Sequence, residues 1–457
     1  MTTSALGPVE WANQQWGNCG FGDRRLTARA VHMGARMVAE PGASLPKQMG
    51  PWAAVMGAYR FLDNPQVTFE KLLQPHWQAT RAAAGQVAVA LLIQDWTTLD
   101  YSAHPKTHGI GPVGSRSQRG MLLHSVLAVE PRQRQVLGLA YAQVIIRAEP
   151  RLPPQGSKRH VGAEGQAWER AVETLGAAPP GVEWVHVSDR ESDIFEYLAA
   201  CRKFGKHFVV RAFHNRRLPQ LNAGEEEAHL LDYVRTWPAA PEPANGYWVE
   251  VDATPTYPKR RAWIVVSWRS VTLPAPSYAQ DQAPLTLQVV RAWEPEPPPG
   301  TKAVEWILLS SWPVTGLADA AQVVHWYACR WLVEDYHQCL KTGCRVEHAQ
   351  LDDGLDLQRL LGLLAPVAVR LLQLRQAVRA GPDVPALTVV DPLTVKLLAA
   401  YFHQAPATLS LQDFWRSVAQ LGGYLARKRD GPPGWRTLWQ GWQQLSAWVT
   451  GARLSVT

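Results

Sequence analysis

Seven consecutive apolar residues, "VAVALLI" at 87–93, place the firmest constraint on how this chain can fold. A strand with one solvent-exposed face alternates apolar and polar residues, whereas a continuous run of apolar residues is typical of a strand buried on both faces. Asp95 follows the run after a single intervening residue. The run therefore predicts a buried strand of an α/β sheet, with a carboxylate at its end.

Patterns of strand and helix alternate after this run. The segments "LLHSVLAVE" and "QVLGLAYAQVII", separated by "PRQR", predict an antiparallel hairpin. Beyond it, helix-like and strand-like patterns follow in turn: "EGQAWERAVETLG", "EWVHVS", "DIFEYLAACRKFG" and "HFVVRAF". The predicted core order is three strands, helix, strand, helix, strand.

Residues 212–305 interrupt this order with strand-like segments. They include "YWVEVDA", "AWIVVSWRSV" and "LTLQVVRAW", and they close with "EPEPPPG", which can continue neither a helix nor a central strand. The strand-like "EWILLSS" then returns to the core. We therefore predict a β-rich insertion inside a catalytic domain that spans residues 76–365.

Both ends of the chain read as helical. Residues 1–75 contain a helix capped by Asp23 and a second helix, "WAAVMGAYRFL", that stops before Asn64-Pro65. The segment is basic but interspersed with acids, so it fits a DNA-binding domain and a solvated helical cap equally. Residues 366–457 form the predicted C-terminal helical domain. Its aromatic stripe fits either a core or a dimer contact, and consists of Trp435, Trp439, Trp442, Leu445 and Trp448.

The charge balance points to a polyanionic partner. The 457 residues include 46 Lys and Arg against 39 Asp and Glu, a net charge of +7, which favours nucleic acid. The start of the sequence lacks a signal pattern, and the longest apolar stretch, "LLGLLAPVAV", is about half the length of a membrane span. We therefore expect a soluble, cytoplasmic (bacterial, nucleoid-associated) protein without a membrane partner.

Five scattered cysteines fit reduced, buried thiols rather than a disulfide framework. A zinc set of His337, Cys339, Cys344 and His348 is disfavoured. On one helix, the first two side chains would point about 160° apart.

The segment "YACRWLVEDYHQCLK" at 327–341 predicts one amphipathic helix. At helical pitch one face gathers Tyr327, Arg330, Glu334 and Lys341 within about 60°. The opposite face is apolar and consists of Cys329, Leu332, Val333, Tyr336 and Leu340. A lone carboxylate between cations fits either a solvated surface or one wall of an active site.

Three carboxylates complete the candidate site. Asp95 and Asp189 each follow a predicted strand, and parallel strands would bring both to one edge of the sheet. Glu334 comes from the helix predicted to pack on that sheet. Adjacent carboxylates repel unless a cation bridges them, and all-oxygen ligation suits Mg²⁺ or Mn²⁺, two ions of which can drive phosphoryl transfer. Arg330 and Lys341 would then bind phosphate.

These residues resemble the insertion-sequence-four family of bacterial cut-and-paste DDE transposases, and within it the transposon-five branch. The family signature Tyr-x2-Arg-x3-Glu-x6-Lys is matched from Tyr327 to Lys341. The first two catalytic acids correspond to Asp95 in "IQDWTTLDYS" and Asp189 in "SDRESDIFEYL". The likeness extends to the termini, through "GDRRLTAR", "GAYRFLDNP" and "LARKRDGPPGWRTLWQGW".

The resemblance implies a ribonuclease H-like core and a metal-dependent reaction on DNA. Both strands at each transposon end would be cut through a hairpin intermediate, and the 3′ ends joined to target DNA. The partners would be the terminal inverted repeats and a second protomer in a synaptic homodimer. By resemblance, Trp306 would stack on a flipped base. The other implied DNA contacts are Trp331, Arg211, Tyr327, Arg330 and Lys341. In the basic N-terminal segment we predict three further DNA contacts, Arg24, Arg25 and Arg60.

Two positions depart from the family pattern. Trp96 follows Asp95 where the family usually has threonine, and "AFHNRR" follows Arg211 in place of a lysine-rich continuation. A plain ribonuclease H-like nuclease or resolvase would share the metal-binding acids, and a domesticated DNA-binding protein would share the terminal domains. A carbohydrate enzyme, which paired acids and 21 tryptophans could suggest, fits the net charge of +7 poorly.

Overall fold

The computed structural model describes residues 6–114, 117–148, 163–218, 228–241, 246–251, 259–380, 382–427, 430 and 433–454. The chain forms two compact units. The first comprises Met1–Gln86, Trp96–Arg151 and Leu332–Thr457, and the second comprises Val87–Asp95 and Leu152–Trp331.

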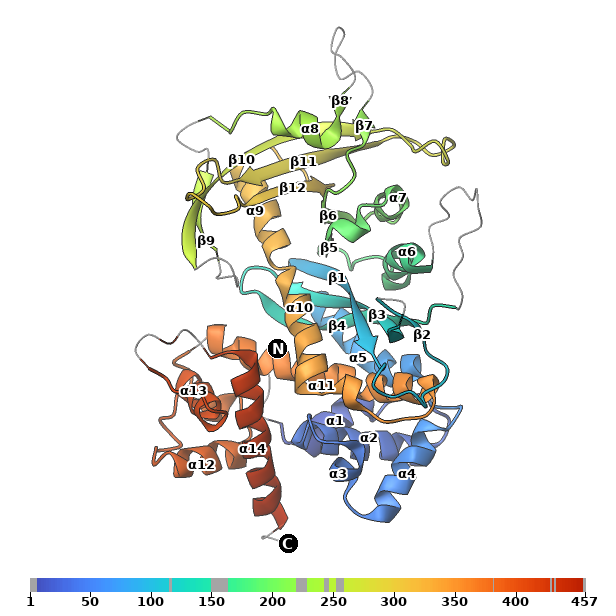
Figure 1. The fold of residues 1–457 in the computed structure, drawn as a ribbon, viewed down its shortest axis with the longest axis vertical. Coiled ribbons are helices and arrows are strands. Elements are labelled where there is room, and N and C mark those ends of the chain that lie inside the picture. Colours follow the sequence, from blue (N-terminus) through green and yellow to red (C-terminus); the bar gives the residue numbers. More distant parts are fainter. Residues whose placement is uncertain are drawn as a thin grey trace. The chain divides into compact units, whose positions relative to one another are not determined.

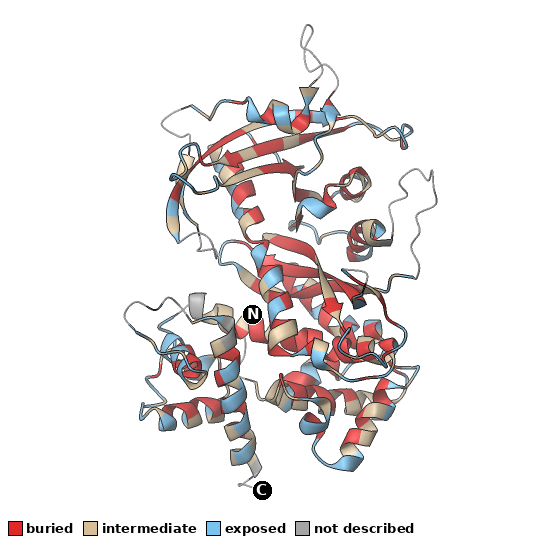
Figure 2. Cartoon of the chain, viewed as in Figure 1, coloured by how far each residue is buried: buried red, intermediate tan, exposed pale blue. Residues whose placement is uncertain are grey.

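The second unit is built on a mixed sheet. Its strands run in the order β1 (Val89–Asp100), β5 (Glu183–Ser188), β6 (His207–Arg211), β12 (Glu305–Ser310), β11 (Leu285–Trp293), β10 (Arg260–Leu273) and β9 (Gly246–Val251). The first three are parallel, and each later pair is antiparallel. The strands of the predicted insertion therefore extend the core sheet. Figure 2 shows much of β10 and β11 buried, whereas β9 is half-buried or exposed.

Helices cover both faces of this sheet. The helices of the unit are α6 (Ala163–Leu175), α7 (Phe195–Lys203), α8 (Leu230–Arg235) and α9 (Leu317–Ala328), with a 3₁₀ turn η1 (Arg190–Ser192) and a small ribbon of β7 (Arg217–Leu218) and β8 (Ala228–His229). Consecutive strand residues face opposite sides. Glu305 binds Arg235 of α8 and Trp306 packs on Tyr327 of α9, so these helices lie on opposite faces (Figure 1).

The first unit begins with helices, as predicted for residues 1–75. They are α1 (Pro8–Trp16), α2 (Arg24–Ala39), α3 (Leu45–Met49), α4 (Trp52–Leu62) and α5 (Phe69–Ala84), and α2 and α4 are the two that the sequence specified. Asp23 caps α2 as expected, since its side chain accepts a hydrogen bond from the Arg25 amide at 2.8 Å. The predicted hairpin is also present, as β3 (Arg119–Glu130) and β4 (Gln135–Ile145), with β2 (Gly111–Pro112) beside β3. The later part of β1 borders β3.

The rest of this unit is helical, as predicted for residues after 345. It contains α10 (Trp331–Gln338), a π-helical turn η2 (Cys339–Gly343), η3 (Val346–His348), α11 (Gly354–Ala380), η4 (Ala386–Thr388), α12 (Pro392–Tyr401), α13 (Leu411–Leu421) and α14 (Trp435–Leu454). No helix in the described ranges is long and apolar enough to cross a bilayer. The five cysteines are buried and reduced, in agreement with the sequence.

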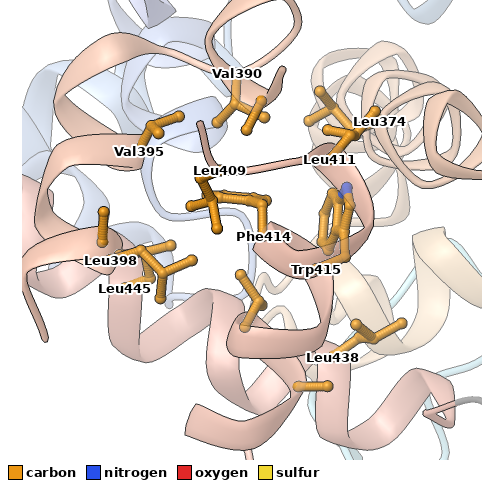
Figure 3. Packing of buried hydrophobic residues seen from close by; sticks show 14 residues of the cluster. Leu374, Val390, Val395, Leu398, Leu409, Leu411, Phe414, Trp415, Leu438 and Leu445 are labelled. Atoms are coloured by element: carbon orange, nitrogen blue, oxygen red, sulfur yellow. The ribbon is translucent and has the colours of Figure 1, made fainter. Parts of the chain in front are cut away.

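The C-terminal helices share a core of their own (Figure 3). Trp442 stacks on Trp415 with ring centroids 5.2 Å apart, and Trp439 and Leu445 are buried. Trp448 packs against Tyr401. These members of the aromatic stripe therefore contribute to the core of the C-terminal segment. Trp442 is only half-buried, and its role in a dimer contact stays a prediction. The side chain of Trp435 lies outside the described residues.

The prediction of one helix over 327–341 is wrong. Helix α9 ends at Ala328, Cys329 and Arg330 form a turn, α10 begins at Trp331, and a π-helical turn starts at Cys339. The predicted apolar face is buried, but Tyr327 and Arg330 are buried as well, at 4% and 8% exposure. Neither proline nor glycine marks the break, and Arg330, which lies in it, binds Asp95. Helical periodicity could not reveal this tertiary contact.

Candidate active site

The register of two parallel strands places the first two predicted catalytic acids at equivalent positions. The ladder between β1 and β5 ends with Gln94 opposite Ser188. Asp95 and Asp189 are the next residues on their strands, and Asp189 caps the turn η1 by accepting a hydrogen bond from the Glu191 amide at 2.8 Å. The predicted parallel pairing is confirmed, and it brings the two carboxyl-bearing positions side by side.

One detail of this prediction is wrong. Asp95 does not end its strand, because β1 continues to Asp100. Strand β1 leaves β5 after Gln94, and its later part borders β3, so the backbone stays extended where the sequence pattern turns polar. The ring of Trp96, the residue that departs from the family pattern, packs 4.6 Å from the imidazole of His124.

Arg330 forms a buried ion pair with Asp95. Its Nη1 atom donates to Asp95 Oδ2 at 2.6 Å, and the two side chains are 10% and 11% exposed. The guanidinium also lies over the ring of Trp331, 4.9 Å from its centroid. Trp331 itself is 58% exposed. The cation beside Asp95 offsets the cost of burying a carboxylate near a second acid.

Tyr327, Arg211 and Trp306 lie together next to this pair. The rings of Tyr327 and Trp306 meet edge to face at 5.0 Å, and Trp306 is half-buried. Burial raises the pKa of the Tyr327 hydroxyl, an effect that the nearby Arg330 and Arg211 oppose and Asp189 reinforces. Arg211 donates to the Glu305 carbonyl at 3.3 Å. The second unit thus contains seven of the predicted site residues, which are Asp95, Asp189, Arg211, Trp306, Tyr327, Arg330 and Trp331.

The other two signature residues belong to the first unit. Glu334 is exposed in the first turn of α10, four residues after Arg330. Lys341 lies in the π-helical turn with its Nζ atom 3.5 Å from Glu347 Oε1, and Glu347 in turn accepts a hydrogen bond from the Asp100 amide at 2.9 Å. Lys341 therefore already has a carboxylate partner.

The carboxylates of the candidate site fit the binding of a hard divalent cation only in part. Asp95 and Asp189 supply carboxylate oxygens, the ligands that Mg²⁺ and Mn²⁺ prefer. Within the described ranges, however, no three His, Cys, Asp or Glu side chains are gathered as a metal group. Asp95 instead has the Arg330 guanidinium as its cationic partner.

A buried polar network lies behind the two acids, and sequence reasoning missed it. The Gln94 amide contacts His186 Nδ1 at 2.6 Å and the Tyr197 hydroxyl at 3.1 Å, while Ser188 and Ser192 join their hydroxyls at 2.5 Å. All five residues are fully buried. Because Gln94 and Ser188 directly precede the two acids, the network ties their strands to α7. A polar Gln94 after an apolar run was the one signal available.

The predicted N-terminal DNA contacts are solvent-accessible. Arg24 and Arg60 are exposed, and Arg25 is exposed but paired with Asp23 at 2.9 Å. A cavity of about 400 Å³ in the same unit is lined by residues of α3 and α4 and by the segment 344–351. None of the three predicted catalytic acids lines this cavity.

Comparison with known families matches both ends of the chain. Residues 8–67 match the family described as transposase DNA-binding, and residues 366–457 match the Tn5 transposase dimerisation domain. Both family models describe parts of transposases, and they match this chain on either side of its α/β region. The chain is therefore similar to transposases at both ends, and to the Tn5 transposase at its C-terminal end. Both matched segments are helical in the structure, while the predicted domain boundaries stay predictions.

Among solved structures, the chain is similar to the piggyBac transposase in its synaptic complex with hairpin DNA. The identity is 10% and the TM-score is 0.37, over 97% of this chain and 84% of that one.

Proposed function

We propose that this chain is a Tn5-like DDE transposase with a ribonuclease H-like core, cutting transposon ends with Asp95, Asp189 and Glu334. The observation that carries the proposal is the register that sets Asp95 and Asp189 side by side, with Arg330 bound to Asp95. Glu334 follows Arg330 by four residues, so the chain itself limits how far it can lie from the pair.

The proposed roles follow from the chemistry of each side chain. The three acids would hold Mg²⁺ or Mn²⁺, two ions of which supply activation of the attacking oxygen and stabilisation of the leaving oxygen. Arg330 offers a planar guanidinium that suits a phosphate, and Lys341 offers a compact positive charge. Trp306 offers a half-buried ring for a base extruded during hairpin formation.

The proposal extends to the ends of the chain. The domain at 8–67 would recognise the terminal inverted repeats, with exposed Arg24 and Arg60 on phosphates and Arg25 in a lesser role because of Asp23. The domain at 366–457 would join two protomers across two DNA ends. After cleavage, the 3′ ends would attack target DNA.

Cleavage of the element's own ends tests this function. The purified full chain would be incubated with labelled end DNA and Mg²⁺, and the strands resolved on a denaturing gel. We expect a nick, then a hairpin, and loss of both in Asp95→Ala, Asp189→Ala and Glu334→Ala with end binding retained in a gel shift. Cutting of unrelated duplexes without hairpins would instead indicate a plain nuclease.

A further inference from the structure

The segment after β6 presents an aromatic ring to solvent beside the proposed active site. Phe213 is 54% exposed. The Arg190 guanidinium lies 5.8 Å from its ring centroid, and the His214 ring meets it edge to face at 5.3 Å. Arg190 directly follows Asp189 in the chain. A single exposed phenylalanine does not by itself indicate a binding site. Further evidence comes from the contacts that fix the backbone of Phe213.

A buried carboxylate fixes the backbone beneath this ring. Asp193 is fully buried, and its Oδ2 atom accepts hydrogen bonds from the Phe213 and His214 amides at 2.7 and 2.8 Å. Its Oδ1 atom binds Arg216 Nη1 at 2.6 Å, and Arg216 also donates to the Asp193 carbonyl at 2.9 Å. A buried charge is tolerated when it is paired and hydrogen-bonded in this way. The backbone at Phe213 is therefore fixed by hydrogen bonds, while its ring stays exposed to solvent.

The charges around the ring suit nucleic acid. Arg190, Arg211 and Arg217 lie on the elements next to the ring, and the nearby acids are Asp189 and Glu191. An aromatic face stacks on any unpaired base, and guanidinium groups hold the adjoining phosphates. A base within a duplex is not available to such a ring, whereas a base in a single strand is.

We propose that Phe213 is a stacking platform for an unpaired base of the DNA strand at the active site, with Arg190 binding the adjoining backbone. The inference rests on the proposed function, which supplies DNA to this face. It adds a second aromatic contact, distinct from Trp306. Its binding energy would favour strands that are already opened, as they are after the first nick.

The test uses DNA ends with 2-aminopurine in a short single-stranded overhang, and the matched blunt duplex, in the absence of divalent metal. We expect Phe213→Ala to weaken overhang binding by about tenfold, with blunt-end binding unchanged and the 2-aminopurine emission no longer quenched. Phe213→Trp should restore both signals. Phe213→Lys should restore affinity through its charge without restoring quenching.

Trp248→Ala, at a residue that is 57% exposed elsewhere in the second unit, is the matched control and should match wild type. Equal losses on blunt and overhanging DNA, or unchanged quenching in Phe213→Ala, would overturn the platform. Because binding is read without cleavage, failure of the proposed function would appear separately, as absent nicking by the wild-type chain in Mg²⁺.

Discussion

The Arg330 guanidinium donates to the Asp95 carboxylate at 2.6 Å, with both side chains about nine-tenths buried. Removing one partner of a buried pair leaves the other charge uncompensated and costs about 3–5 kcal/mol. Arg330→Ala should therefore lower the thermal unfolding midpoint and also abolish nicking. Arg330→Lys should recover stability but not nicking, because an ammonium lacks the planar fork for phosphate.

A double variant separates the two effects of Arg330. In Asp95→Asn/Arg330→Ala the carboxylate is gone, so stability should return while cleavage stays absent. If Arg330→Lys cuts DNA at the wild-type rate, Arg330 serves only to neutralise Asp95.

Trp306 should control hairpin formation more than the first nick. Extruding a base costs a few kcal/mol, and stacking on an aromatic ring returns about 1–3 kcal/mol of it. Trp306→Ala should thus nick end DNA and accumulate little hairpin, whereas Trp306→Phe keeps a ring and should form more. The products are resolved on a denaturing gel over time. Because Trp306 also packs on Tyr327, a joint loss of nicking and thermal stability would assign it to the core.

The sequence predicted the secondary structure well where local pattern decides it. The run at 87–93 became β1, the "PRQR" hairpin became β3 and β4, and Asp23 caps α2. It failed where a tertiary contact overrides the pattern. The turn at Cys329 and Arg330 has no glycine or proline, and the Arg330 side chain in it binds Asp95.

The sequence indicated charged residues of the candidate site. It did not indicate the buried polar residues that hold their strands and loops in place. Asp95 and Asp189 could be named from strand ends, since parallel strands share an edge. His186, Tyr197 and Asp193 could not, because a buried polar side chain is recognised by its hydrogen-bond partners and those come from distant segments.

Trp442 and Tyr401 separate stability from association in the dimerisation domain. Trp442 stacks on Trp415 in the core, so Trp442→Ala should lower the free energy of unfolding by about 2 kcal/mol or more. Tyr401 is 56% exposed at the end of α12. Tyr401→Ser removes the contact with Trp448 but no fully buried side chain, so it should lower stability less than Trp442→Ala does. It should weaken the dimer on DNA ends, measured by sedimentation. A dimer that survives Tyr401→Ser unchanged would place the interface elsewhere.

Buried histidines should make the fold sensitive to acid. Burial lowers the pKa of His186 to about 3, against about 6.5 in an unfolded chain. Its contribution to stability is fully present above about pH 6.5 and is lost as the pH falls toward 3, because only the unfolded chain binds the proton in that window. Between pH 6.5 and 5 this amounts to about 1.5 kcal/mol. His124 and His76, with pKa values lowered to about 3 and about 4, act in the same direction.

Denaturant unfolding at pH 7 and pH 5 checks this expectation. His186→Gln should unfold with a smaller difference between the two pH values than wild type does. His348→Gln, at an exposed position, should show the wild-type difference. An unchanged difference in His186→Gln would mean that His186 is protonated or accessible in the folded chain.

Asp95, Asp189 and Glu334 are proposed to bind metal at one site. Ferrous iron can replace Mg²⁺, and with ascorbate and peroxide it releases radicals that cut the polypeptide beside the bound ion. We expect cuts near residues 95, 189 and 334 together, suppressed by excess Mg²⁺ and lost in Asp189→Ala. Cuts near 95 and 189 without 334, or only at unrelated segments, would contradict it.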